Sequence, residues 1–232
     1  MKPLKEFVSE LRNSRETSLI VIACSKNKRS DEELEEIFNR SYNFEDQNIK
    51  FNGKVLKLIK NFQRCSKINH KTALNFSKEY PAYLRYKGRF YEAVWRRGGI
   101  KVWKKVVEDG WKVLILSAFY GFLRITDPIG NYDLRLSDLN NKCKKLLPEI
   151  LKVIMDTHDI KKVYFLTSEE YAEPFRGKLP NLYRVILLDR YGKEIVGYDY
   201  KEYFSEAGEL FAYMVYGGNI PNKTRYIELE EI

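Results

Sequence analysis

Three cysteines and two histidines are few for a chain of 232 residues, and their scarcity limits the chemistry that the protein can perform. Cys24, Cys65 and Cys143 are odd in number, far apart in the sequence and never spaced as C-x-x-C. This pattern argues against both a disulfide framework and a zinc cage. Two histidines also exclude a histidine-rich metal site. We therefore expect no metal ion and no cofactor.

Long hydrophobic runs are also absent. No stretch approaches the roughly 20 consecutive apolar residues that a membrane-spanning helix needs. Residues 1–15 carry charges throughout and lack the apolar region of a secretory signal. Hydrophobic residues still make up 44% of the chain, enough to bury a core. We expect a soluble, cytoplasmic protein with no membrane partner.

Positive charge is what the sequence has in excess. The net charge is +9, but residues 50–112 contain 17 basic and 4 acidic residues, a local charge of +13 that leaves −4 for the rest. Aromatic residues are interleaved with these cations, a mixture that suits nucleic acid because cations attract phosphates and aromatic rings stack on exposed bases. The alternative is that the aromatic rings face the core and the lysines form a solvated surface. The candidate nucleic-acid contacts are Arg85, Lys87, Arg89, Arg96, Arg97, Lys101, Lys104 and Lys105.

Continuous apolar segments alternate with amphipathic ones along the chain. Buried strands are predicted over residues 18–24, 111–117, 162–167 and 183–188. Helices are predicted over residues 1–12, 31–40, 54–64, 72–76, about 99–109, 138–158, 168–175 and 202–216. This alternation predicts an α/β fold, with a largely parallel sheet flanked by helices. We expect residues 1–232 to form a single domain, with a basic helical insertion at about 31–110 between the first and second core strands.

Polar loops follow three of the predicted strands. Ligands of parallel sheets bind beyond the carboxyl ends of the strands, so these loops are the candidate site. In the first loop, Ser25, Lys26 and Lys28 could hold a phosphate, and Cys24 could act as a nucleophile whose pKa is lowered by the lysines. The loop lacks the glycines of a phosphate-binding fingerprint. A small buried cysteine beside solvated lysines is the alternative interpretation.

The second loop, residues 117–135, is too long and too rich in aromatic residues, Asp and Arg to be a simple connector. Its candidates are the acid Asp127 and the ligand contacts Ser117, Tyr120, Gly121, Arg124 and Tyr132.

The third loop begins a predicted helix and offers two ligand contacts, Ser168 and Tyr171, and a candidate acid, Glu170. An ordinary helix cap by Ser168 would explain the same sequence.

The second loop resembles the S-x-x-Y-G-x-L-R-x-x-D-x-I-x-x-Y-x-L signature of YaaA-type peroxide-stress proteins. The matching residues are Ser117, Tyr120, Gly121, Leu123, Arg124, Asp127, Ile129, Tyr132 and Leu134.

The other two loops extend this resemblance. Residues 168–171 match the S-x-E-Y of that family, and Cys24, Ser25 and Lys28 resemble the C-S-x-x-K opening of smaller relatives. Between residues 18 and 171 the chain is similar to a distant member of the YaaA-like superfamily. The resemblance implies an α/β fold with a cleft between these loops. For the peroxide-stress members it also implies DNA binding linked to protection from oxidative damage, although no helix-hairpin-helix glycine pattern is evident between the first two strands.

Three functions remain open at this point. The leading hypothesis is a nucleic-acid-binding protein, with DNA a better partner than RNA. The alternative is an enzyme acting on a nucleotide, nucleoside or nucleobase. In that enzyme Lys26 and Lys28 would hold phosphate. Tyr120 and Tyr132 of the second loop would stack on the base, and either Asp127 or Glu170 would transfer protons. The third possibility is a structural protein whose lysines only keep it soluble.

Overall fold

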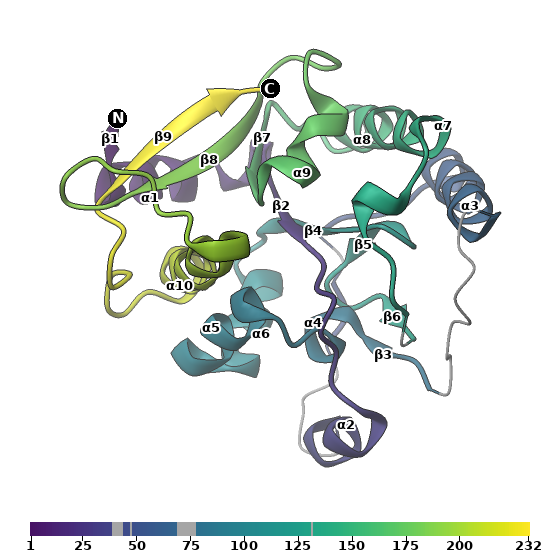
Figure 1. The fold of residues 1–232 in the computed structure, drawn as a ribbon, viewed down its shortest axis with the longest axis horizontal. Helices are drawn as coiled ribbons and strands as arrows, with labels where there is room; N and C mark the ends of the chain where they lie inside the picture. The colour runs from purple at the N-terminus through teal and green to yellow at the C-terminus, as the bar shows by residue number, and fades with distance from the viewer. Residues whose placement is uncertain (39–43, 47, 69–77, 131) are drawn as a thin grey trace.

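One mixed sheet of seven strands organises the protein (Figure 1). The computed structural model describes residues 1–38, 44–46, 48–68, 78–130 and 132–232. Strands β2, β4, β7 and β8 are parallel, whereas β1, β5 and β9 run antiparallel to their neighbours. Across the sheet the order is β1 (Lys2–Pro3), β9 (Tyr226–Glu231), β8 (Leu182–Leu188), β7 (Lys162–Leu166), β2 (Ser18–Ala23), β4 (Lys112–Ser117) and β5 (Gly121–Arg124). The predicted α/β class is confirmed.

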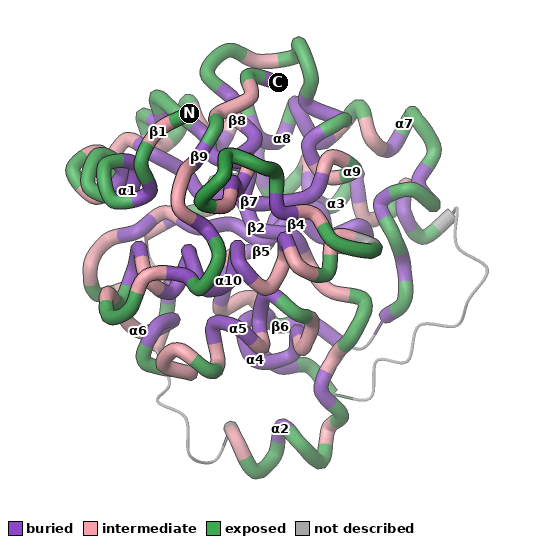
Figure 2. Tube along the Cα trace, turned by 60° about the vertical axis from the view of Figure 1, so that its left-hand side comes forward, coloured by how far each residue is buried: buried purple, intermediate pink, exposed green. Residues whose placement is uncertain are grey.

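The central strands are continuous apolar runs because helices cover both faces of the sheet. Every residue of β2 is buried, and Val21 pairs with Leu114 of β4 on one side and Phe165 of β7 on the other. The buried residues of Figure 2 accordingly concentrate along these strands.

The two faces of the sheet carry different helices (Figure 1). On the first face, the Phe7 ring of α1 lies 5.8 Å from the Tyr164 ring of β7, and Arg12 donates to the carbonyl of Met214 in α10. On the second face, the Phe175 ring lies 4.8 Å from Phe165. The first face holds α1 (Leu4–Asn13), α5 (Arg89–Gly98), α6 (Ile100–Glu108) and α10 (Lys201–Tyr216). The second holds α3 (Gly53–Ile68), α8 (Leu146–Thr157) and α9 (Glu169–Ala172).

Shorter elements complete the chain. They are the helices α2 (Asp31–Phe38), α4 (Ala82–Arg85) and α7 (Asn141–Lys144), and a two-stranded sheet of β3 (Tyr80–Pro81) and β6 (Pro128–Ile129). Short 3-10 turns cover Arg15–Thr17, Leu136–Asp138, Glu173–Phe175 and Tyr198–Tyr200.

The predicted insertion is confirmed, since α2 to α6 all lie between β2 and β4. The prediction began a helix near Gly99 and missed α5, although Phe90, Tyr91 and Val94 have helical spacing and are buried. Gly99 has a φ of 57°, which separates α5 from α6. The prediction also missed β1, β5, β6 and β9, and it joined α7 to α8. The helix predicted over residues 72–76 lies outside the described residues.

The cysteine pattern argued against a disulfide framework, but the structure contains one disulfide. Cys65 in α3 and Cys143 in α7 are bonded, with Cα atoms 5.6 Å apart, whereas Cys24 is free. The two cysteines are separated by 78 residues, and they meet because α3 packs against α7 and α8. Sequence spacing therefore gave no indication of their proximity.

The carboxyl ends of β2 and β7 form the switch point of the sheet. The chain leaves β2 through the insertion, whose last helix α6 packs on α10 on the first face, and reaches β4. It leaves β7 through the turn at Phe175 on the second face and reaches β8. The connection from β2 leads to β4 on one side, and the connection from β7 leads to β8 on the other. Neighbouring strands whose connections lead away in opposite directions leave a crevice between their ends, where ligands of such folds bind.

Close contact between α5 and α10 is possible only at a glycine. A Cβ atom on Gly208 would lie 2.3 Å from the carbonyl oxygen of Phe90 and 2.8 Å from the Cβ of Ala93. No flexible side chain can move aside to relieve the backbone contact.

Gly208→Ala should therefore force the two helices apart and lower the free energy of unfolding by about 1–3 kcal/mol. Urea denaturation measures this change. Gly53→Ala is the matched control, because a Cβ at Gly53 meets nothing within 4 Å. Equal stability of the two variants would contradict the packing described here.

Candidate functional site

A cleft of about 580 Å³ lies at the switch point of the sheet. The loop after β2, the loop after β7 and the first turns of α5 and α10 surround it. Its lining residues are Ala23, Cys24, Ser25, Lys26, Asn27, Gly88, Arg89, Phe90, Tyr91, Arg135, Ser168, Glu170, Tyr171, Tyr200, Lys201 and Phe204.

Positive charge dominates the rim of this cleft. Lys26, Arg89, Arg135 and Lys201 are all exposed there. The first turns of α5 and α10 add backbone N–H groups without intrahelical partners and the positive ends of two helix dipoles. Glu170 is the acidic residue of the lining, and its Oε1 accepts a hydrogen bond of 2.8 Å from the backbone N–H of Ser137. The cleft is therefore suited to an anion.

Aromatic rings and small polar groups form the interior of the cleft. Tyr171, Tyr200 and Phe204 are half-buried, so part of each ring faces the cleft. The free thiol of Cys24 lies 3.2 Å from the hydroxyl of Tyr171. Such walls suit a flat ring, and the thiol and hydroxyl groups provide hydrogen bonds.

Gly88 lets the loop after β2 approach the start of α5. A Cβ atom on Gly88 would lie 2.2 Å from the Oγ of Ser25. Tyr91 is buried next to this contact, and its hydroxyl donates a hydrogen bond of 2.9 Å to the carbonyl oxygen of Ala23. These contacts join the loop and the helix into one wall of the cleft.

Lys28, a predicted phosphate contact, does not line the cleft. Its ammonium group donates to three carbonyl oxygens: those of Ser25 at 3.1 Å, Lys26 at 3.2 Å and Tyr132 at 2.5 Å. An ammonium group has three donors, so all of them are used within the protein. Burial lowers the pKa of Lys28 from 10.5 to about 8. Its role is to hold the loop after β2 against the loop after β4.

Ser117 and Tyr132, two predicted ligand contacts, belong to a buried chain of hydroxyl groups. The Tyr132 hydroxyl lies 2.8 Å from Ser117 Oγ and 2.6 Å from the Tyr86 hydroxyl. Burial raises the pKa of Tyr132 and of Tyr86 well above the usual value, so both stay protonated. Only 3% of Tyr132 is exposed, so its ring does not present a face on which a base could stack.

The remaining candidates of the second loop also lie outside the cleft lining. Asp127 accepts hydrogen bonds from the backbone N–H and the Nε of Arg124, at 2.7 and 2.8 Å, which closes the turn after β5. Tyr120 accepts from the N–H of Gly130, and Gly121, with a φ of 76°, makes the turn between β4 and β5. These signature residues therefore organise a turn, and Glu170 is the predicted acid that faces the cleft.

Most of the predicted nucleic-acid contacts are ion-paired within the protein. Arg85 is 1% exposed and bonds to Asp31, so it does not reach the surface. Arg97 bonds to Glu209 of α10 at 2.6 Å. The other pairs are Lys87 with Glu33, Arg96 with Glu209, Lys104 with Glu108 and Lys105 with Asp109.

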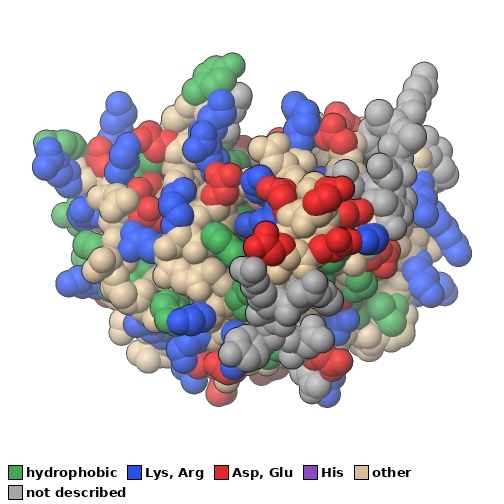
Figure 3. All heavy atoms as spheres, turned by 90° about the horizontal axis from the view of Figure 1, so that it is seen from below, with side chains coloured by type: hydrophobic (Ala, Val, Ile, Leu, Met, Phe, Trp, Pro, Cys, Tyr) green, Lys and Arg blue, Asp and Glu red, His purple; other side chains and the backbone are tan. Residues whose placement is uncertain are grey.

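Acidic residues of α2 supply the partners of two of these contacts, Arg85 and Lys87. This helix, DEELEEIF, lies just before the segment whose charge is +13, and it folds back on that segment. Figure 3 shows acidic side chains gathered on the face where α2 lies. Among the eight predicted contacts, Arg89 and Lys101 are exposed and have no ion pair with any described residue. Of these two, Arg89 lines the cleft.

Several residues of the cleft had no predicted role, among them Phe90, Arg135, Tyr200, Lys201 and Phe204. A usable signal existed for three of them. Tyr200, Lys201 and Phe204 begin the helix that follows β8, where helix N-termini reach the carboxyl edge of a parallel sheet.

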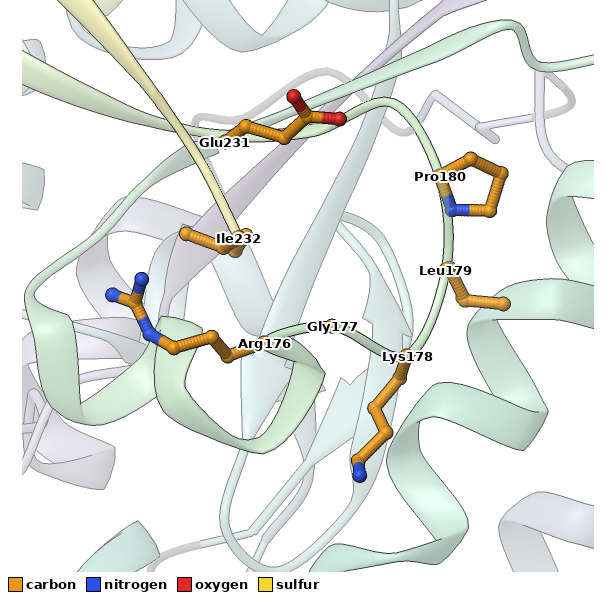
Figure 4. A pocket seen from close by; sticks show the side chains of 7 residues that line it. All are labelled: Arg176, Gly177, Lys178, Leu179, Pro180, Glu231 and Ile232. Atoms are coloured by element: carbon orange, nitrogen blue, oxygen red, sulfur yellow. The ribbon is translucent and has the colours of Figure 1, made fainter.

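A second hollow, of about 600 Å³, lies by the turn after Phe175 (Figure 4). Its charged side chains do not converge. Lys178 and Glu231 point away from each other, and Arg176 is bound to Glu169 and Glu230. It is also remote from the carboxyl ends of the parallel strands, so the cleft is the better candidate site.

Among the residues that the structure describes, no helix has the length and apolar character needed to cross a membrane. The same residues contain no cluster of three or more His, Cys, Asp or Glu side chains placed to hold a metal ion.

The buried ammonium of Lys28 predicts a pH-dependent stability. Between about pH 8 and pH 10.5 the unfolded chain keeps a proton that the folded chain has released. The free energy of unfolding must therefore rise with pH in this window, by up to about 3 kcal/mol relative to Lys28→Met. Denaturant titrations of the wild-type protein and of Lys28→Met from pH 7 to 10.5 measure this difference in the free energy of unfolding. If the two free energies changed with pH in parallel, the prediction would be refuted. Lys26→Met controls for the loss of one charge from the same loop.

Comparison with known protein families matches residues 18–197 to the family described as Peroxide stress protein YaaA. The matched span runs from β2 past α9 and includes every cleft residue except the three at the start of α10. It also covers the loops whose motifs resemble this family, so the resemblance is confirmed. No curated protein matches the chain. The chain belongs to the YaaA peroxide stress protein family.

Proposed function

We propose that this protein binds nucleic acid and takes one nucleotide unit into the cleft at the switch point. One observation carries the proposal: two helix N-termini and four exposed basic side chains surround an aromatic interior. Anions bind at helix N-termini, and guanidinium groups bind phosphate through paired hydrogen bonds. Arg89 and Lys201, each in the first turn of a helix, would contact the phosphate.

The interior of the cleft supports recognition of the base. Tyr171 and Phe204 present partly exposed rings beside the basic rim, and stacking of one base on such a ring is worth roughly 1–3 kcal/mol. Single-stranded nucleic acid or a strand end fits this arrangement, because its bases are free to enter. Membership in the peroxide stress family supports a role under oxidative stress. DNA is the partner that the motif resemblance to YaaA-type proteins implies.

The test is fluorescence anisotropy of labelled single-stranded DNA, duplex DNA and RNA across a salt series. Arg89→Glu combined with Lys201→Glu should weaken binding at least tenfold. It should also reduce the slope of log K against log salt by roughly 1.5, because each phosphate contact contributes about 0.7 in a single strand and about 0.9 in a duplex. The matched control is Lys5→Glu combined with Lys162→Glu, two exposed residues outside the cleft lining. Equal effects of the two double variants would refute the cleft assignment.

A second candidate function is an enzyme that acts on the nucleotide held in the cleft. The observation that favours it is the pairing of a free thiol, Cys24, with the Tyr171 hydroxyl at 3.2 Å, near the exposed carboxylate of Glu170. A thiol can attack a ring or phosphate, and a carboxylate can transfer a proton during the reaction. Asp127 is not available for this role, because Arg124 engages its carboxylate.

For the enzyme, chromatography of nucleotides and short oligonucleotides after incubation with the protein should reveal a product. Glu170→Gln should then reduce turnover by about 10²-fold or more while nucleotide-induced thermal stabilisation persists. Glu173→Gln, an exposed neighbour that does not line the cleft, is the control. Absence of product would leave nucleic-acid binding as the function, whereas full turnover by Glu170→Gln would exclude Glu170 as the group that transfers the proton.

A further inference from the structure

The exposed side of α3 is strongly basic. Lys57, Lys60, Arg64 and Lys67 are exposed and recur at intervals of three and four residues, so they lie along one stripe of the helix. The opposite side of α3 is buried in the core through Val55, Ile59, Phe62 and Ser66. The helix contains no acidic residue.

A second group of cations lies next to this stripe. The Cys65–Cys143 disulfide fixes α7 beside the C-terminal half of α3. Lys142 and Lys144 flank Cys143 in the sequence, as Arg64 flanks Cys65. We call the combined surface the α3–α7 basic face; its members are Lys54, Lys57, Lys60, Arg64, Lys67, Lys142, Lys144 and Lys145.

The cations of this face have no ion-pair partner among the described side chains. None of its eight members forms an ion pair there, whereas the cations near α2 and α10 are paired with carboxylates. The unpaired positive charge is therefore concentrated on α3, which lies within the basic segment 50–112, and on α7, rather than at the eight predicted contacts.

This arrangement matches a polyanion. The 16 residues of α3 span about 24 Å, and its cations follow one another about every 5 Å along the axis. Regularly spaced cations that replace condensed counterions supply most of the affinity of non-specific nucleic-acid binding. An anionic membrane suits the face less well, because interfacial helices insert an apolar side and the apolar side of α3 is buried.

We propose that the α3–α7 basic face binds the sugar-phosphate backbone of a nucleic acid, as a contact separate from the cleft. Figures 1 and 2 place α3 and α7 on the opposite side of the molecule from α5 and α10, whose first turns line the cleft. The proposal rests on the proposed function and extends it. The cleft takes one nucleotide, and the face holds a longer stretch of the same polymer.

The experiment compares DNA of about 4 and about 24 nucleotides by fluorescence anisotropy across a salt series. Lys57→Glu, Lys60→Glu and Arg64→Glu combined should weaken binding of the longer DNA at least tenfold. The three substitutions should lower the slope of log K against log salt for the longer DNA by roughly 2 to 3, at about 0.9 per phosphate contact. They should leave binding of the short DNA unchanged. A second variant on the other helix, Lys142→Glu with Lys145→Glu, should act in the same direction. Circular dichroism and thermal unfolding confirm that the variants fold.

The outcomes separate this proposal from the proposed function. If wild-type protein binds neither DNA, the proposed function itself fails. If both DNAs bind and the cleft variant Arg89→Glu with Lys201→Glu weakens both, while the α3 variant weakens neither, the basic face is overturned alone. Lys5→Glu, Lys162→Glu and Lys193→Glu combined, three exposed cations outside the face and the cleft, control for net charge. Binding to phosphatidylglycerol vesicles at the same salt concentration as tightly as to DNA would overturn nucleic acid as the partner.

Discussion

The packing of α5 against α10 is the contact on which the site depends. Because position 208 is glycine, the two helices approach closely enough for Phe90 of α5 to pack against Phe211 of α10, with ring centroids 5.5 Å apart. One helix belongs to the insertion and the other lies near the C-terminus. Their contact brings two first turns to the crevice that the diverging connections of β2 and β7 already create. The cleft therefore depends on a sheet topology and on one interhelical contact.

Ion pairing within the protein determines where its positive charge is available. Arg85, Lys87 and Arg97 each bind a carboxylate from a distant part of the chain, so their charge contributes to folding. The exposed pairs add little stability, but they remove cations from the surface that meets a ligand. On the cleft rim, Lys26 lies 3.9 Å from Asp133, whereas Arg89, Arg135 and Lys201 have no ion pair with a described residue; the cations of the α3–α7 basic face also have none. A sequence with one basic segment thus folds into a protein with two separate basic surfaces.

The sequence predicted the elements that local pattern determines. The central strands were found because each is a continuous apolar run, and the loops of Cys24 and Ser168 were found because parallel strands end at one edge. The disulfide, the burial of Tyr132 and the three carbonyl partners of Lys28 could not be predicted, because each joins residues that are distant in sequence. Lys201 was missed although the sequence offered a signal, because it begins the helix that follows β8, where helix N-termini reach the carboxyl edge of the sheet.

The central claim is that nucleic acid enters the cleft, and photo-crosslinking tests it most directly. A DNA strand ending in 5-bromouracil would be irradiated with the protein, and the modified peptides would be identified by mass spectrometry. The account predicts crosslinks to the aromatic residues of the cleft, above all Tyr171 and Phe204. Crosslinks confined to residues outside the cleft, at protein concentrations that saturate the DNA, would contradict it.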